Sequence, residues 1–203
     1  MRQLALDITP PPEPTLENFV PGANAELHSR LRELAEGRLA ESVLYLWGEP
    51  GSGRSHLLAG TARAARCPLV VADDVERLDD AAQVALFHRI NEARESSGAV
   101  LAAGAAPPAQ LAVREDLRSR LGWGLVYHVK PLTDAERAVF LAREAERRGV
   151  RLPEEAVRYL LVRARRDLRS LISILAWLDR ASLEQQRHIT LPLVREALKT
   201  LDE

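Results

Sequence analysis

Short, mostly apolar runs alternate with helix-like segments over the first two thirds of the chain. Each run is five residues long, which is typical of strands buried on both faces of a parallel sheet. The four candidate strands are Val43–Trp47, Pro68–Ala72, Ala99–Ala103 and Leu125–Val129. The segments 55–66 and 80–94 between them have helical character. This alternation predicts an α/β fold in which right-handed crossovers place helices on both faces of the sheet.

Two segments with helical spacing indicate which of their sides faces inward. They span residues 24–36 and 80–94. The residues expected inside are Leu27, Leu31 and Leu34 in the first helix and Val84, Phe87 and Ile90 in the second. A single apolar side on each helix predicts packing against the sheet rather than full burial.

The last third of the chain contains helix signals alone. Thr133 and Glu136 form a capping-box pattern, and Gly149 is placed to end the helix that they begin. Pro153 lies in the first turn of the next helix. Two further helices are expected over 167–182 and 191–201. The expected parts are a tail with its linker (1–15), an α/β nucleotide-binding domain (16–131) and an all-helical lid domain (132–203).

Composition excludes several classes of protein. Of the 203 residues, 46% are hydrophobic and 28% are charged, as in ordinary globular proteins. The formal net charge of -1 gives no support for nucleic-acid binding through overall charge. Cys67 is the one cysteine, so an intramolecular disulfide and an all-cysteine metal site are excluded. No apolar run suffices for a membrane helix, and Asp7 interrupts any signal-peptide core, so we expect a cytoplasmic protein without membrane contact.

A phosphate-binding loop is indicated directly after the first candidate strand. Gly48, Glu49, Pro50, Gly51, Ser52, Gly53, Arg54 and Ser55 fit the pattern G-x-x-x-x-G followed by a cation and a hydroxyl. Backbone N–H groups of such a loop hold phosphate at the start of the following helix, and Ser55 would ligate Mg²⁺. Arg54 replaces the usual lysine, which favours binding of the nucleotide over its rapid hydrolysis. A chance glycine-rich turn is the alternative.

A pair of acidic residues follows the second candidate strand. Asp73 would hold Mg²⁺ through water, and Asp74 would orient the attacking water, as in a Walker B site. The alternative is that Asp73 and Asp74 cap the next helix. The phosphate loop favours the first interpretation.

With these motifs joined, the whole chain resembles the AAA+ module of the DnaA-related family, and the Hda type in particular. The segment Asn18–Asn24 is similar to the motif that lies against the adenine, which implies roles for Phe19 and Val20. The residues Gly53–His56 resemble the phosphate loop of the Hda type, which adds His56 to the expected nucleotide contacts. The resemblance implies ADP or ATP as the ligand, together with Mg²⁺.

Two arginines acquire roles from the same resemblance. Leu117–Gly124 is similar to box VII of the family, with Arg120 at the arginine-finger position. Asp167–Leu171 is similar to the sensor 2 helix, with Arg169 at the position that reaches the phosphates. Without that context Arg120 would be an exposed cation on a short helix, and Arg169 would cover apolar surface with its stem.

The first residues alternate as an extended segment and are separated from the rest by the proline-rich stretch 10–14. Either the segment is a peptide offered to a partner or it is a strand docked on its own sheet. Gln3, Leu4 and Leu6 are similar to the motif by which Hda-type proteins bind the bacterial sliding clamp. The glutamine amide would bond at the rim of the pocket while the two leucines fill an apolar groove.

The chain also departs from the family pattern. Only residues 56–72 separate Ser55 from Asp73, so the edge strand of the family is expected to be lost and about four strands to remain. The sensor 1 position carries no polar side chain over Ala102–Pro107, so weak intrinsic ATPase activity is expected. The chain stops at Glu203 without a duplex-binding domain, so sequence-specific DNA binding is not expected.

The resemblance therefore implies a negative regulator of replication initiation. Bound to the clamp, the protein would dock on DnaA and promote hydrolysis of its ATP through Arg120; self-association is compatible with the pattern. Two alternatives stay open at this point. One is a helicase-loader-like ATPase, and the other is a clamp-tethered interaction module whose nucleotide site has decayed.

Overall fold

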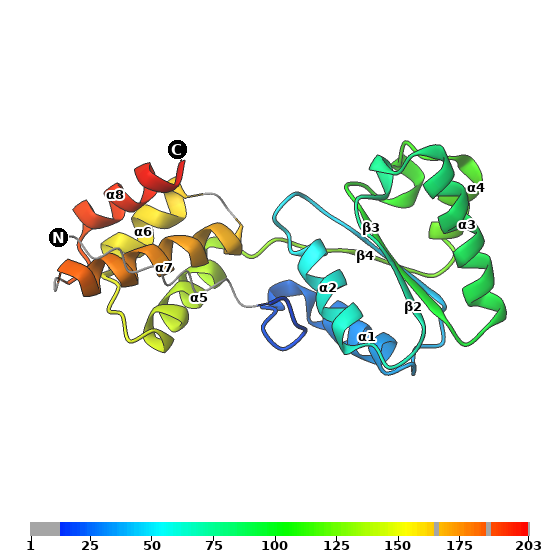
Figure 1. Ribbon diagram of the computed structural model, residues 1–203, viewed down its shortest axis with the longest axis horizontal. Coiled ribbons are helices and arrows are strands. Elements are labelled where there is room, and N and C mark those ends of the chain that lie inside the picture. Colours follow the sequence, from blue (N-terminus) through cyan, green and yellow to red (C-terminus); the bar gives the residue numbers. More distant parts are fainter. Residues whose placement is uncertain (1–12, 165–166, 186–187, 203) are drawn as a thin grey trace. The chain divides into compact units, whose positions relative to one another are not determined.

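The computed structural model describes residues 13–164, 167–185 and 188–202. The chain divides into two compact units, an α/β unit from Pro14 to Glu136 and a helical unit that begins at Arg137. Figure 1 shows the ribbon of both units. No described helix is both long and apolar enough to cross a membrane.

The α/β unit is built on one parallel sheet of four strands, as predicted. The strands are β1 (Val43–Trp47), β2 (Leu69–Ala72), β3 (Ala99–Gly104) and β4 (Leu125–His128), in the order β2-β3-β1-β4. Within the described part of the chain β2 pairs with β3 alone, which leaves Val71 39% exposed at this edge of the sheet. β2 is thus an edge strand of the four-stranded sheet.

Helices cover both faces of the sheet (Figure 1). One face carries α1 (Ala25–Ala35) and α2 (Arg54–Ala64), and the other carries α3 (Asp80–Glu95) and α4 (Glu115–Leu121). Alternate residues of β1 belong to two separate hydrophobic cores, one on each face of the sheet. Leu44 and Leu46 pack with α1 and α2, whereas Val43 and Tyr45 pack with α3 and α4. The two central strands, β1 and β3, are buried on both faces, which is why they are continuous apolar runs.

The inward side of α3 differs from the expectation. Ile90 is fully buried and Phe87 packs against the core, but Val84 is 36% exposed, so its expected inward position was wrong. Gln83 takes the inward position instead. Its amide donates to the carbonyl of Leu78 at 2.9 Å and accepts from the N–H of Arg114 at 2.9 Å. A buried side chain with both partners satisfied costs little, which is why a polar residue can occupy this face.

The helical unit contains α5 (Asp134–Arg147), α6 (Glu154–Arg163), α7 (Leu168–Gln185) and α8 (Leu191–Asp202) around one apolar core. The capping box is present, because the N–H of Thr133 donates to Glu136 at 2.8 Å and the N–H of Glu136 donates to the Thr133 hydroxyl at 3.2 Å. Gly149 has a φ of +70° after the end of α5, the left-handed conformation that glycine adopts most readily. Pro153 caps α6 and stands just before its first turn, one position earlier than expected.

Candidate functional site

The loop between β1 and α2 has the backbone of a phosphate-binding loop. Gly51 and Gly53 have φ values of +82° and +101°, which only glycine adopts without strain. Gly53 is the N-cap of α2 and no side chain caps this end. The first N–H groups of α2 therefore point to a position where an anion would accept them.

The same loop approaches the rest of the sheet too closely for any side chain at Gly48. A Cβ at this position would lie 2.6 Å from the Val129 carbonyl oxygen and 3.0 Å from the Ser52 hydroxyl. Ser52 is 7% exposed, and its Oγ is buried without a hydrogen-bond partner in the structure. An unsatisfied buried hydroxyl is costly, so this loop fits a ligand that brings acceptor oxygens.

Arg54 and Asp74 join the phosphate loop to the second strand. An Nη of Arg54 lies 3.5 Å from a carboxylate oxygen of Asp74, and the arginine side chain is 11% exposed. The other Nη of Arg54 is buried and has no hydrogen-bond partner in the structure. Asp74 has a φ of +44°, and its N–H donates to the Asp73 carboxylate at 2.9 Å. The loop cation and the acidic pair thus form one cluster, with a guanidinium edge left to meet an anion.

Asp74 is the N-cap residue of the short 3-10 helix Val75–Arg77, but its side chain makes no capping hydrogen bond, so side-chain capping does not account for the acidic pair. The N-cap of α3 is Asp79, whose carboxylate accepts from the N–H of Ala82 at 2.8 Å. Among the described residues no group of three or more His, Cys, Asp and Glu side chains gathers as a metal site. Ser55 is exposed at the start of α2, so Ser55 and Asp73 would hold Mg²⁺ only together with phosphate oxygens and water.

A carboxylate that the sequence did not reveal lies at the end of β3. One oxygen of Glu76 accepts from the N–H of Ala105 at 3.2 Å, and the other is buried without a partner in the structure. A Cβ on Gly104 would lie 2.3 Å from the Tyr45 hydroxyl and 2.8 Å from Glu76 Oε2. Glu76, in the turn that follows β2, thus lies beside the segment after β3, which has no polar side chain over Ala102–Pro107.

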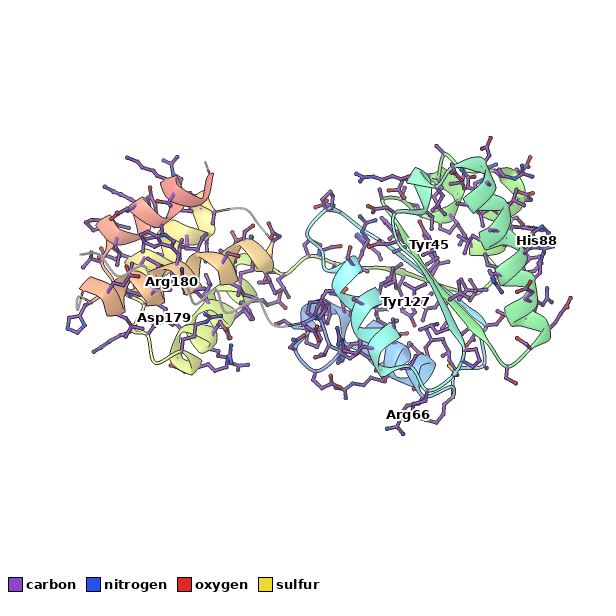
Figure 2. All side chains as sticks on the ribbon, viewed as in Figure 1. Tyr45, Arg66, His88, Tyr127, Asp179 and Arg180 are labelled. Atoms are coloured by element: carbon purple, nitrogen blue, oxygen red, sulfur yellow. The ribbon has the colours of Figure 1, made fainter. Side chains whose placement is uncertain are left out.

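Tyr45 extends from the core of the α/β unit to the residues at the end of β3. Its hydroxyl donates to the Ala106 carbonyl at 2.8 Å, and Figure 2 shows the side chain inside the α/β unit. Burial raises the pKa of Tyr45 strongly, the charge of Glu76 raises this pKa further, and Arg54 opposes both. Tyr45 therefore stays protonated and serves as a donor.

The segment that resembles the adenine motif lies against the phosphate loop. A Cβ on Gly53 would come within 2.9 Å of the Phe19 ring, and Val20 is half-buried beside it. The ring of His56 lies 5.6 Å from that of Phe19, and its Nε2 is 2.9 Å from the Thr15 carbonyl oxygen. His56 thus contacts the N-terminal segment, a role that its motif did not indicate.

Asn24 secures the end of this segment to the sheet. Its side-chain amide donates to the Lys130 carbonyl at 2.8 Å and accepts from the Lys130 N–H at 2.8 Å. Asn24 is 4% exposed, and the pairing joins residues that are distant in the sequence. The backbone of Lys130, two residues after the end of β4, therefore fixes where the N-terminal segment crosses the α/β unit.

Arg120 lies on α4, apart from the phosphate loop. Its guanidinium carbon is 3.4 Å from the centroid of the Trp123 ring and 5.3 Å from that of Phe87. Its Nε is buried without a hydrogen-bond partner in the structure, whereas Trp123 is 45% exposed. Arg94 lies 4.7 Å from the same indole ring. The guanidinium of Arg120 therefore lies over an exposed aromatic ring, on the face of the sheet opposite α2.

The remaining expected site residues cannot be placed by their side chains. Gln3, Leu4 and Leu6 lie outside the described residues, and so does the side chain of Arg169, whose backbone belongs to α7. The start of α7 is ordered by Asp167, which accepts from the N–H of Ser170 at 2.9 Å. The clamp contact and the phosphate contact of Arg169 stay predictions.

Comparison with known proteins places both units. Residues 134–198 match the family model "Hda, lid domain". Domain III of the Thermotoga maritima replication initiation protein DnaA is similar, with a TM-score of 0.76 and 22% identity over 94% of this chain and 97% of that one. AMPPCP-bound DnaA from Aquifex aeolicus has a TM-score of 0.70 and 20% identity, over 86% of this chain and 68% of its own.

A more distant similarity marks the wider fold. A RuvB variant from Thermotoga maritima has a TM-score of 0.69 and 18% identity, over 92% of this chain and 72% of its own. The similarity to these solved structures, at 18–22% identity, establishes the fold. The match of residues 134–198 to the Hda lid model indicates a closer relationship to that family. The chain therefore has the fold of DnaA domain III, and its residues 134–198 match the lid domain of the Hda family.

Proposed function

We propose that this protein binds an adenine nucleotide and acts as a negative regulator of a DnaA-type replication initiator. The observation that carries the nucleotide part is the loop from Gly48 to Ser55, with its uncapped helix start and its unsatisfied Ser52 hydroxyl. The match of residues 134–198 to the Hda lid supports the regulatory part. Two similar structures are DnaA bound to AMPPCP, which favours adenine as the base.

The nucleotide is held mainly by groups that need no proton transfer. Backbone N–H groups at the start of α2 donate to the phosphate oxygens, and the Nη of Arg54 that does not face Asp74 adds charge-assisted hydrogen bonds to them. Phe19 and Val20 offer an apolar surface to the base, and Arg169 approaches the phosphates from the lid. Mg²⁺, when bound at Ser55 and Asp73, neutralises phosphate charge.

Intrinsic hydrolysis is slow in this proposal. Asp74, the carboxylate expected to orient the attacking water, is paired with Arg54 at 3.5 Å and with Arg77 at 3.6 Å. Each of its two oxygens thus faces one guanidinium group, which leaves the carboxylate poorly placed to orient a water molecule. The protein then serves as a nucleotide-bound regulator more than as an ATPase.

Arg120 acts in trans on the ATP of the initiator. Stacking on Trp123 fixes the plane of the guanidinium and leaves its charge in place. Such a finger stabilises the charge that develops on the transferring phosphoryl group and raises hydrolysis by about a thousandfold or more in well-studied systems. The tail residues Gln3, Leu4 and Leu6 bring the protein to clamp-loaded DNA, where tethering raises its effective concentration.

The test is hydrolysis of ATP bound to the matching initiator, with and without this protein, in the presence of clamp-loaded DNA. We expect strong stimulation that depends on the clamp. Arg120→Ala should abolish it while clamp binding persists, and Arg118→Ala on the same helix is the matched control. Gln3→Ala should remove only the dependence on the clamp. Equal stimulation by Arg120→Ala would exclude the finger role.

One observation favours a second candidate. Because Arg54 is tied to Asp74, the site is compatible with a clamp-tethered interaction module that has lost its nucleotide. Calorimetric titration with ADP and ATP separates the two functions, since the module binds neither. Appreciable ATP turnover by the isolated protein would point to a helicase-loader-like ATPase instead.

A further inference from the structure

A short segment that runs into the start of the adenine-like motif is held against α2 by specific contacts. This strap consists of residues Thr15–Phe19. Two local hydrogen bonds close its turn. The N–H of Thr15 donates to the side-chain amide oxygen of Asn18 at 2.9 Å, and the N–H of Asn18 donates to the Thr15 hydroxyl at 3.2 Å. Leu16 is 2% exposed and belongs to the core beneath α1 and α2.

The strap touches the backbone of α2 at Gly60. A Cβ at this position would lie 2.8 Å from the Thr15 carbonyl carbon and 2.9 Å from the Leu16 nitrogen. Both atoms belong to the main chain, so they cannot yield without a shift of the strap itself. A glycine in the middle of a helix is unfavourable for the helix, and close passage of the strap gives a reason for it.

Two histidines from different helices hold successive carbonyl groups of the strap. His56 Nε2 on α2 is 2.9 Å from the Thr15 oxygen, and His28 Nε2 on α1 is 2.6 Å from the Leu16 oxygen. A carbonyl only accepts, so each Nε2 carries the proton and donates. Both rings also flank Phe19, with centroids 5.9 Å away for His28 and 5.6 Å for His56.

The far end of the strap reaches the phosphate loop. The Phe19 ring lies against Gly53, where a Cβ would come within 2.9 Å of it. Gly53 in turn starts α2 in the left-handed conformation that aims the first helical N–H groups. The position of Phe19 and the shape of the loop are therefore coupled through direct contact.

We propose that His28, His56 and Gly60 are positioning residues for the nucleotide, which act by holding the strap so that Phe19 supports the phosphate loop. This inference rests on the proposed nucleotide binding. None of the three needs to touch the ligand. By reciprocity, a ligand that favours the ordered loop also stabilises the strap.

The first experiment is titration of the full chain with ADP. His28→Phe keeps an aromatic ring beside Phe19 but removes the donor, so affinity should fall about three- to tenfold, as for loss of one hydrogen bond. His28→Gln restores a donor and should recover part of the loss. His88→Phe is the matched control, because His88 is exposed on the outer side of α3 (Figure 2).

Gly60→Ala provides an independent variant. Alanine favours the helix, so α2 itself does not suffer, yet the added methyl group displaces the strap. ADP affinity should fall without loss of helical circular dichroism. Unchanged affinity in both Gly60→Ala and His28→Phe would overturn the proposal.

A double-mutant cycle separates positioning from general stability. If His28 acts through Phe19, His28→Phe should have no further effect on ADP affinity once Phe19→Leu is present. Additive losses would overturn the inference. Absence of ADP and ATP binding in the unaltered protein would instead refute the proposed nucleotide function, so the two failures are distinct.

Hydrogen exchange supplies a second readout that does not depend on a variant. Saturating ADP should slow exchange at the amides of Thr15 and Asn18, which close the turn of the strap. Unchanged exchange there, with protection confined to the phosphate loop, would contradict the coupling.

Discussion

At the scale of single residues, the decisive feature is the difference between the surroundings of the two Nη groups of Arg54. One Nη faces Asp74 and the other is buried without a partner in the structure. A lysine in this position would bring one compact charge and could not serve both sites with a planar fork. In the proposed function, Arg54 therefore holds phosphate with one Nη and faces Asp74, the carboxylate proposed to orient water, with the other.

Removal of that guanidinium should weaken nucleotide binding. Hydrogen bonds to charged groups contribute about 1.5–3 kcal/mol, so Arg54→Ala should lower ADP affinity by roughly ten- to a hundredfold. Arg77→Ala is the matched control, because Arg77 also faces Asp74 but is 80% exposed and contributes little. Calorimetric titration measures both. Equal losses in the two variants would mean that Arg54 acts only by neutralising Asp74.

Trp123 is the second residue with a specific expected effect. A cation–π contact of a partly exposed arginine contributes about 0.5–2 kcal/mol, so Trp123→Ala should reduce stimulation of initiator ATP hydrolysis by roughly two- to thirtyfold. Trp123→Phe should retain part of it, and ADP binding should not change. Arg94→Ala tests specificity, since Arg94 contacts the same ring but is no finger. Full stimulation by Trp123→Ala would show that Arg120 needs no aromatic support.

At the scale of elements, capping and turn residues were predicted most reliably, because their partners lie within a few positions along the chain. Thr133 and Glu136 bond each other as the pattern required, and Gly149 adopts a positive φ. The inward side of α3 was less predictable. Val84 fits the apolar pattern, yet Gln83 is inside, because distant backbone groups at Leu78 and Arg114 satisfy its amide.

The capping box should contribute measurably to stability. Thr133→Ala removes an N-cap and should lower the free energy of unfolding by about 1 kcal/mol in chemical denaturation. Thr200→Ala in α8 is the control, since its hydroxyl only bonds back to the Glu196 carbonyl within the same helix. A loss no larger than that of the control would contradict the capping role.

The cap also predicts a dependence on pH. Hydrogen bonds from the backbone and side chain of Thr133 lower the pKa of Glu136 below its usual value. Folding thus favours the ionised carboxylate of Glu136. Its contribution to the free energy of unfolding is complete above the pKa that Glu136 has in the unfolded chain, and it disappears as pH falls through the pKa in the folded protein. The difference between Thr133→Ala and the unaltered protein should accordingly shrink in acid.

At the scale of the whole molecule, topology determines where the chemistry lies. The phosphate loop, the acidic pair and Glu76 follow the carboxyl ends of β1 and β2, and Gly104 ends β3. Parallel strands bring these ends to one edge of the sheet, which is where ligands of open α/β sheets bind. The order β2-β3-β1-β4 then places β3 between the loop and the acidic pair.

The sequence by itself determined the local features of this protein. Strand runs, helix caps, the glycine loop and the acidic pair all depend on residues close together in the chain, and so they could be recognised from spacing. The resemblance to the DnaA-related family added the lid, and the lid match agrees with it.

Only the tertiary structure decided which distant groups meet. It brought Glu76 and Tyr45 to the end of β3, paired Arg54 with Asp74, and laid the strap across Gly60. Each of these contacts joins residues from different elements, so no local period encodes it. The physical reason is that close packing and satisfaction of buried polar groups are conditions on the whole fold.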